Sequence, residues 1–484
     1  MFAGALGDRV PSAVQARQSP PRSQCPSHAN CRTTKKRRMI GESLMESSPS
    51  RLTQLENRLG ASWRHINGAR SRSQAKREEL KFSLRRIDSE DTSIVVFGSL
   101  ARDEFTEGSD VDWTLLVDGF ADPKHLELAR KIDQIVSSTS KPPGREGAFG
   151  NLAFSHELVQ QIGGEDDTNR NTTRRILLLL ESNIVGRPEA YERVVTNILR
   201  RYIFEDRGFV QQSGPYHVPR FLLNDFARYW WTMAVDFAYK QRTRFGEGAA
   251  IRNIKLRMSR KLLYVSGLLT CFGCELGFGD VKRAPDSPGP NGAAECVDCL
   301  RRQLRQTPRE ILASALLHFD HLNETGRKLL DAYDGFLGIL ADGDSRKRLA
   351  SLEADAYESD AVFQDARKLS HQFREGLLDL FFDRKSGLFE LTKNYGVFGS
   401  GLLWFSTGLT PPVETCKAGG VCESRQAENQ KMKCRPVSWP STDYWETFRP
   451  LWNRNSPSGP SGPKSYRSLG VKEGKSGVSA VLRA

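Results

Sequence analysis

The sequence predicts an α+β protein, with a small mixed-sheet domain, a larger all-helical C-terminal domain and disordered tails. Three observations support this fold class. Short β-branched runs occupy residues 93–97 and 111–117, each followed by a glycine-containing turn. Beyond Asp167, apolar residues recur almost throughout at the three- and four-residue spacing of helices. Residues 1–50 and 411–484 have neither period, so we expect them not to fold.

The basic charge of the chain is concentrated in these two tails. The 484 residues carry a net charge of +13. Residues 1–50 hold 8 basic and 3 acidic side chains, and residues 411–484 hold 12 and 6. The Lys35–Arg38 cluster fits a nuclear address or a nucleic-acid tether, although a solvated charge run is the simpler interpretation. We therefore expect no specific nucleic-acid partner and only nonspecific contact through the tails.

Composition also bears on the compartment. No apolar run reaches the roughly 18 residues that cross a bilayer, and the N-terminus lacks the apolar segment of a signal peptide. Nine cysteines, an odd number scattered along a long chain, fit a reducing environment better than a disulfide framework. These features predict a soluble cytoplasmic protein without a membrane partner.

The folded part is expected to begin with a helical lead-in over 51–87. The sheet domain follows over 88–165, with a helix at about 123–138 and a third strand at about 152–159. The all-helical domain covers 166–400. Its clearest helices are expected over about 219–241, 251–269, 308–319, 326–340 and 360–382, with a Pro- and Gly-rich linker at 280–294.

The chemistry is expected where the two strands meet. The first strand ends in Gly98-Ser99, ten residues intervene, and Asp110-Val111-Asp112 opens the second strand. Side chains alternate along a strand, so Asp110 and Asp112 should lie on one face about 7 Å apart. Such a carboxylate pair suits Mg²⁺ or Mn²⁺ bound to a triphosphate. Gly98 permits a close backbone approach, and Ser99 starts a helix whose N–H groups can hold phosphate oxygens.

The segment from Val95 to Gly119 resembles the DNA polymerase β-type nucleotidyltransferase superfamily. That family combines a strand, Gly-Gly or Gly-Ser, a gap, and Asp-x-Asp or Asp-x-Glu. Within it, GSLARDEFTEGSDVDWTLLV is similar to minimal bacterial nucleotidyltransferases and to the uridylyltransferase of the PII protein. A looser similarity covers residues 169–194, of which 174–194 resemble the helix-turn-helix that follows the catalytic unit in the uridylyltransferase type. The resemblance implies metal binding by Asp110 and Asp112, and NTP contacts from Gly98 and Ser99.

The resemblance implies further site residues. Arg102 and Ser109 join the nucleotide-binding set, because Arg102 follows Gly-Ser where such proteins often place an arginine. Most members also use a third carboxylate from a later strand. Glu157 is the first choice for this catalytic role, with Asp166 and Asp167 as alternatives. An ordinary residue on the surface of a helix is an equally good interpretation of Glu157.

Two groups of polar residues in the helical domain are candidates for substrate contacts. Arg252, Lys255 and Ser259 are spaced to share one helix face, and Lys255 is expected to reach the triphosphate as family members do with a basic residue. A solvated basic face is the simpler account. The second group fits either an acceptor pocket or helix-helix contacts; it consists of Asp225, Arg228, Asp236 and Lys240.

Four cysteines form two CxxC pairs separated by 21 residues. The spacing resembles a zinc ribbon, in which four thiolates hold a structural Zn²⁺. However, the first pair continues an apolar helix, where cysteine is an ordinary small hydrophobe. Both interpretations stay open for these residues, which are Cys271, Cys274, Cys296 and Cys299.

The predicted function is metal-dependent transfer of a nucleoside monophosphate from an NTP to an acceptor, with release of pyrophosphate. The NTP is the expected partner, and the acceptor is a protein or a small molecule that the sequence does not identify. Two alternatives remain. One is an aminoglycoside-type adenylyltransferase, which acidic residues in the acceptor pocket would favour. The other is a non-catalytic nucleotide-sensing or interaction protein, which the lack of a third carboxylate would favour.

Overall fold

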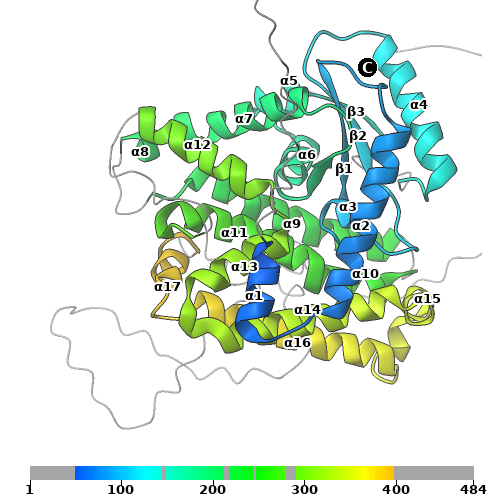
Figure 1. Ribbon diagram of the computed structural model, residues 1–484, viewed down its shortest axis with the longest axis vertical. Coiled ribbons are helices and arrows are strands. Elements are labelled where there is room, and N and C mark those ends of the chain that lie inside the picture. Colours follow the sequence, from blue (N-terminus) through cyan, green and yellow to red (C-terminus); the bar gives the residue numbers. More distant parts are fainter. Residues whose placement is uncertain (1–48, 144–148, 212–216, 244–246, 279–289, 397–484) are drawn as a thin grey trace, which may run out of the picture. The chain divides into compact units, whose positions relative to one another are not determined.

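The computed structural model describes residues 49–143, 149–211, 217–243, 247–278 and 290–396 (Figure 1). The predicted disordered tails lie outside these residues, apart from the two positions that precede the first helix. Most of the predicted linker also lies outside them. Its last residues are helical, because α12 (Pro290–Leu304) begins earlier than the Pro/Gly composition indicates.

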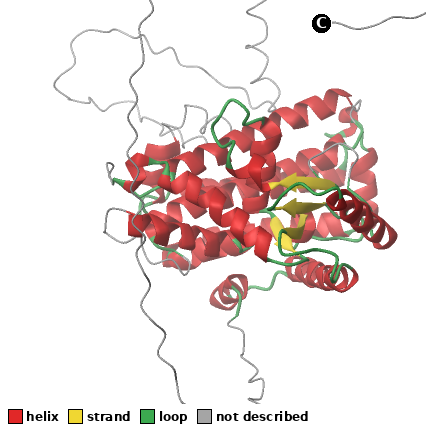
Figure 2. Cartoon of the chain, turned by 90° about the horizontal axis from the view of Figure 1, so that it is seen from above, coloured by secondary structure: helices red, strands yellow, loops and turns green. Residues whose placement is uncertain are grey.

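A four-stranded mixed sheet confirms the predicted small α/β unit. The strands lie in the order β3-β2-β1-β4, with β1 antiparallel to both neighbours and β3 parallel to β2. In Figure 2 helices lie on both sides of these strands. The strands are β1 (Thr92–Phe97), β2 (Trp113–Val117), β3 (Asn151–Phe154) and β4 (Ser182–Ile184).

Both faces of the sheet are covered, which explains why every residue of β1 and β2 is buried. Ile94 and Val96 face a cluster formed with α2 (Arg64–Ser83) and α4 (Lys124–Thr139). Val95 and Phe97 point to the other face and join the large core that includes the helical region. Alternation along β1 therefore ties the sheet to two separate packing layers.

Helices make up the rest of the described chain. The first group comprises α1 (Arg51–Leu59), α3 (Gly98–Ala101), α5 (Ser155–Val159), α6 (Asn169–Leu180), α7 (Glu189–Phe204), α8 (Arg207–Val210) and α9 (Arg220–Thr243). The second comprises α10 (Ala249–Lys255), the π-helix η1 (Leu256–Arg260), α11 (Lys261–Leu276), α13 (Pro308–His318), α14 (Asn323–Ala341), α15 (Gly343–Ser351), α16 (Ala361–Phe381) and α17 (Leu388–Leu391). Short η segments occupy Asp320–Leu322, Ala354–Ala356 and Thr392–Gly396. Among the described helices, none is long and apolar enough to span a membrane.

The element boundaries differ from the sequence prediction in two places near the sheet. The third strand ends at Phe154, and the chain continues as helix α5 rather than as a strand to 159. The predicted helix-turn-helix over 174–194 contains strand β4 between α6 and α7, and β4 pairs with β1. The sheet therefore extends past the predicted boundary at 165.

The lead-in helices α1 and α2 pack against helices that lie far away in the sequence. Helix α1 contacts α13, and α2 contacts both α14 and the short helix α3 (Figure 1). The Trp63 indole donates a hydrogen bond to Asp331, and the backbone N–H of Ile66 donates to Asp334. Residues that precede the sheet in the sequence thus pack against residues that follow it.

Candidate active site

The turn after β1 is built around a glycine that no other residue can replace without strain. Gly98 has φ +68°, the left-handed region, and a Cβ there would lie 2.9 Å from Oδ2 of Asp112. The backbone N–H of Phe97 donates to the carbonyl of Asp112, at 2.9 Å. The group that comes close to the backbone at Gly98 is therefore the carboxylate of Asp112.

The two aspartates stand directly before β2, which begins at Trp113 rather than at Val111. Asp110 is exposed and pairs as an isolated bridge with Lys141, whereas Asp112 is partly buried. Burial, followed by the charges of Asp110 and Glu181, raises the pKa of Asp112 to about 7. Two carboxylates that repel each other just before a strand concentrate negative charge there, and this charge favours a bound cation.

A cavity of about 540 Å³ opens beside these carboxylates, a size typical of sites for small-molecule ligands. Besides Asp110 and Asp112, its walls come from the first turns of α6, the middle of α9, and α10 with η1. The lining residues outside the carboxylate pair are Phe149, Asn169, Arg170, Thr173, Leu177, Tyr229, Thr232, Met233, Asp236, Phe237, Lys240, Arg252, Lys255, Leu256 and Arg260.

Three of the cavity's cations come from one continuous helical stretch, at Arg252, Lys255 and Arg260. The sequence prediction placed Ser259 on this face, but Ser259 is buried and does not line the cavity. The π-helix η1 explains the change, because its i→i+5 pairing brings Arg260 over Lys255. Burial, followed by the charge of Arg346, lowers the pKa of Lys255 to about 8.

Comparison with known families agrees with this geometry. Residues 77–143 match the family model described as nucleotidyltransferase domain, and the matched range contains Gly98, Asp110 and Asp112. The chain carries a nucleotidyltransferase domain. Comparisons with curated proteins and with solved structures give no match. The match confirms the predicted superfamily, while the cavity's helical walls all lie beyond the matched range of the nucleotidyltransferase domain.

Glu181 is a site residue that the sequence reasoning missed. It follows the last residue of α6, its side chain is fully buried, and it pairs with Arg102 and, at 2.7 Å, with Arg260. It thereby holds one of the cavity's cations in place, and its charge also acts on Asp112. The available signal was a charged residue directly after the apolar run Ile176–Leu180, a position that only a paired carboxylate tolerates.

Four predicted nucleotide-binding residues lie outside the cavity lining, namely Gly98, described above, Ser99, Arg102 and Ser109. Ser99 sits in α3 next to the turn, and Ser109 bonds to Thr106 to close the loop before Asp110. Arg102 is 6% exposed and pairs with two carboxylates. Although burial acts in the opposite direction, Glu104 and Glu181 raise the pKa of Arg102. The charge of Arg102 is thus neutralised by carboxylates of the protein itself.

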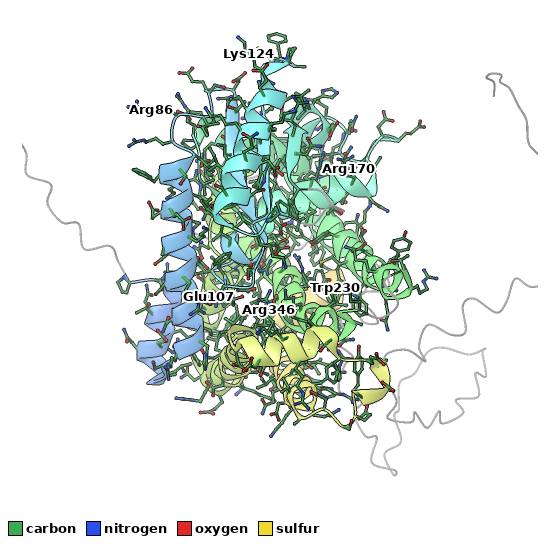
Figure 3. The ribbon with its side chains drawn as sticks, turned by 90° about the vertical axis from the view of Figure 1, so that its right-hand side faces the viewer. Arg86, Glu107, Lys124, Arg170, Trp230 and Arg346 are labelled. Atoms are coloured by element: carbon green, nitrogen blue, oxygen red, sulfur yellow. The ribbon has the colours of Figure 1, made fainter. Side chains whose placement is uncertain are left out.

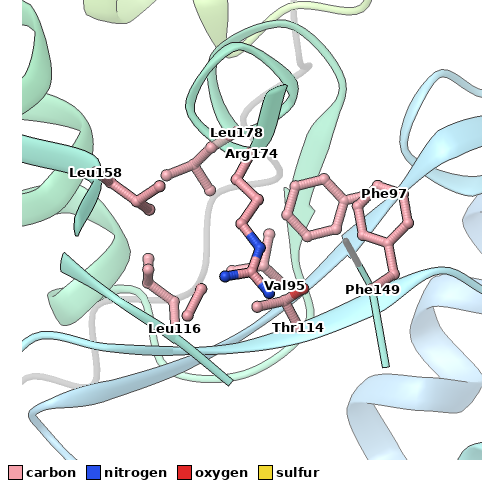
Figure 4. A pocket seen from close by; sticks show the side chains of 9 residues that line it. Val95, Phe97, Thr114, Leu116, Phe149, Leu158, Arg174 and Leu178 are labelled. Atoms are coloured by element: carbon pink, nitrogen blue, oxygen red, sulfur yellow. The ribbon is translucent and has the colours of Figure 1, made fainter. Parts of the chain in front are cut away.

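The candidate third carboxylates also lie apart from the aspartate pair. Glu157 on α5 pairs with Arg174 at 3.5 Å and does not line the cavity. Arg174 points into a separate apolar space of about 10 Å³ between the sheet and α6, beside Val95 and Thr114 (Figure 4). Glu157 therefore faces a buried arginine. Of the alternatives, Asp166 does not line the cavity either.

A buried network on α9 divides the acceptor candidates into two pairs. Arg175 donates to both oxygens of Asp167 and to Asp225, so Asp225 belongs to helix-helix packing. Arg228 joins the same network through Asp167. The other two, Asp236 and Lys240, line the cavity and pair with each other at 2.7 Å.

The four cysteines are buried on two packed helices, α11 and α12. The Sγ atoms of Cys274 and Cys296 are 3.8 Å apart. That separation is close to the S···S distance of two thiolates in a tetrahedral zinc site with Zn–S bonds of about 2.3 Å. However, within the described ranges no group of three or more His, Cys, Asp and Glu residues is arranged to hold a metal. Zinc stays a prediction, and packing explains the burial without it.

Proposed function

We propose that this protein transfers a nucleoside monophosphate from an NTP to an acceptor and releases pyrophosphate, with Mg²⁺ or Mn²⁺ bound at Asp110 and Asp112. The observation that carries the proposal is the position of the carboxylate pair. It lines a cavity that Arg252, Lys255 and Arg260 also line. Anionic and cationic groups around one space are what a metal-bound triphosphate requires.

The donor set fits a small hard cation. Mg²⁺ in nucleotide sites is bound by one or two carboxylates, and substrate phosphates and water complete its coordination. Asp110 and Asp112 supply the two carboxylates, so a third acidic ligand is not required. The raised pKa of Asp112 records negative charge that a divalent cation would neutralise. When bound, the metal would supply charge neutralisation of the triphosphate and of the attacking oxygen.

The protein's own groups would orient the triphosphate. Arg260 is held by Glu181, so its guanidinium faces the cavity in one orientation. Lys255, with a pKa of about 8, is mostly protonated at pH 7, and a phosphate in the cavity would favour this charged form. These fixed cations would stabilise charge on the leaving pyrophosphate without reorganising during the reaction.

The cavity's charge argues against a polycationic acceptor. Apart from the catalytic pair, the lining contains one acidic residue, Asp236, against five basic ones. Asp236 is already paired with Lys240. An aminoglycoside would find no unpaired carboxylate in this wall, whereas a neutral or anionic acceptor would meet no repulsion. We therefore propose a protein hydroxyl, a neutral small molecule or a phosphate-bearing molecule as acceptor.

Labelled NTPs test the proposal directly. The purified chain is incubated with each α-labelled NTP and Mg²⁺ or Mn²⁺, with and without cell extract, and pyrophosphate and labelled products are measured. Asp110→Asn and Asp112→Asn should each lower transfer at least ~10²-fold. Asp118→Asn is the matched control, because Asp118 directly follows the same strand and pairs with Arg193 away from the cavity.

The outcomes separate the candidate functions. Pyrophosphate release that depends on both aspartates supports the transferase. NTP binding without release from any NTP supports a nucleotide-sensing protein instead. Release that survives in both variants would place the chemistry elsewhere.

A further inference from the structure

The loop that joins Gly98-Ser99 to Asp110 is held by side chains from distant helices. Arg77 of α2 donates to the carbonyl of Leu100 at 2.6 Å and to the Asp103 carboxylate at 2.7 Å. Arg309 of α13 donates to the carbonyls of Arg102 and Asp103, at 3.0 and 2.7 Å. Asp103 has φ +62°, a left-handed conformation that is unfavourable for an aspartate. These contacts hold the first half of the loop in a strained shape.

The second half of the loop is held by two residues of α14 and α15. The Tyr333 hydroxyl donates to Glu104 at 2.5 Å. Arg346 donates through one nitrogen to Thr106 Oγ1, at 2.5 Å, and through the other to the carbonyl of Gly108, at 2.6 Å. Glu107 and Arg346, both labelled in Figure 3, mark this contact. It joins residues 238 positions apart in the sequence.

The loop is shaped to receive this arginine. A Cβ on Gly108 would lie 3.0 Å from Nε and 3.1 Å from Cζ of Arg346, so the guanidinium lies against bare backbone. Thr106, the other acceptor, is 5% exposed and also bonds to Ser109, the residue before Asp110. Arg346 thus contacts the chain two residues before Asp110 and fixes the turn that delivers it.

Resting on the proposed function, we infer that Arg346 is a positioning residue that sets Asp110 for metal binding. Arg346 does not line the cavity; it holds the chain before the metal ligand through Thr106 and Gly108, and its charge also acts directly on Asp110 and Lys255. This role needs a guanidinium, because one planar group donates to two acceptors, the hydroxyl of Thr106 and the carbonyl of Gly108. The helical region beyond the family match is therefore part of the catalytic apparatus.

The expected kinetic signature is a loss of kcat with little change in KM. Displacing a catalytic group by about 1 Å through a remote change can lower turnover ~10²-fold. We expect Arg346→Met to lower kcat for pyrophosphate release at least ~10-fold and to weaken Mn²⁺ binding, with KM for the NTP within about threefold. Arg346→Lys keeps the charge but supplies one donor direction, so it should restore part of both quantities.

The matched control is Arg348→Met on the same helix. Arg348 pairs with the carboxylate of Asp360 instead of with the loop. Its loss should leave kcat and Mn²⁺ affinity unchanged. Gly108→Ala and Thr106→Val perturb the same contact from the loop side, so they keep the test valid if Arg346→Met unfolds. In a double-mutant cycle, Thr106→Val and Arg346→Met should be non-additive in kcat.

Mn²⁺ binding, measured by electron paramagnetic resonance with the full chain, separates this inference from the proposed function. If the unaltered chain binds Mn²⁺ without turnover, the effect of Arg346→Met on Mn²⁺ affinity still decides the positioning role. Equal effects of Arg346→Met and Arg348→Met would overturn the inference alone. A chain that binds no Mn²⁺ would overturn both it and the proposed metal site.

Discussion

Replacing Asp112 with asparagine should abolish transfer and at the same time stabilise the fold. An unfolded aspartate ionises near pH 3.8, whereas burial beside Asp110 and Glu181 raises the pKa of Asp112 to about 7. A folded-state pKa above the unfolded value gives stability that is full below pH 3.8 and is lost as the pH rises through 7. Asparagine carries no ionisable proton and escapes this loss.

The magnitude follows from the pKa. A tenfold change in an ionisation constant is worth ~1.4 kcal/mol, so the ionised carboxylate destabilises the fold by at most ~4 kcal/mol above pH 7. Asp112 is only partly buried, and solvent screening reduces this ceiling to about 2–4 kcal/mol. At pH 5, where the folded carboxyl is still protonated, the stability difference should be less than half as large.

Urea denaturation in EDTA at pH 5 and pH 8 measures both values. Asp112→Asn should be more stable than the unaltered chain, mainly at pH 8. Added Mg²⁺ should stabilise the unaltered chain at pH 8 and not the variant, since a ligand stabilises only the state that binds it. Asp118→Asn loses the pair with Arg193 and should be at most about 1 kcal/mol less stable. The reasoning is refuted if Asp112→Asn is less stable at pH 8, or if its gain is the same at both pH values.

Three further changes test the site, and a fourth tests the cysteine cluster. Gly98→Ala should cost about 1–2 kcal/mol of stability through its positive φ and abolish transfer by displacing the adjacent carboxylate, as unfolding and pyrophosphate assays would reveal. Lys255→Met should raise the Kd for NTP at least ~10-fold. In the unaltered chain, the affinity for NTP should fall above pH 8, because Lys255 then loses its proton. Calorimetry at a series of pH values measures both effects. Glu157→Gln should keep near-normal transfer because its carboxylate lies off the cavity; a large loss would restore it as a catalytic residue. The zinc hypothesis predicts one Zn²⁺ per chain by elemental analysis, lost in Cys296→Ser/Cys299→Ser with NTP binding retained, and zinc-free protein would identify these cysteines as packing residues.

The sequence by itself determined the local part of the site. A β-branched strand, a glycine turn and Asp-x-Asp before a second strand are all set within 25 residues, and the structure and the family match agree on them. Local backbone preferences decide such a unit. Gly98 is required by its own φ and by Asp112, fourteen positions away.

Tertiary structure decided everything that depends on which distant elements meet. Glu157 and Asp225 have suitable chemistry, yet packing gives them Arg174 and Arg175 as partners. Strand β4 was hidden because a three-residue strand between two helices carries no period of its own and forms only by pairing with β1. The π-helix that moves Arg260 into the cavity is likewise invisible to a 3.6-residue period. Long-range partners such as Arg346 depend on the packing of whole helices, and no short sequence window contains that information.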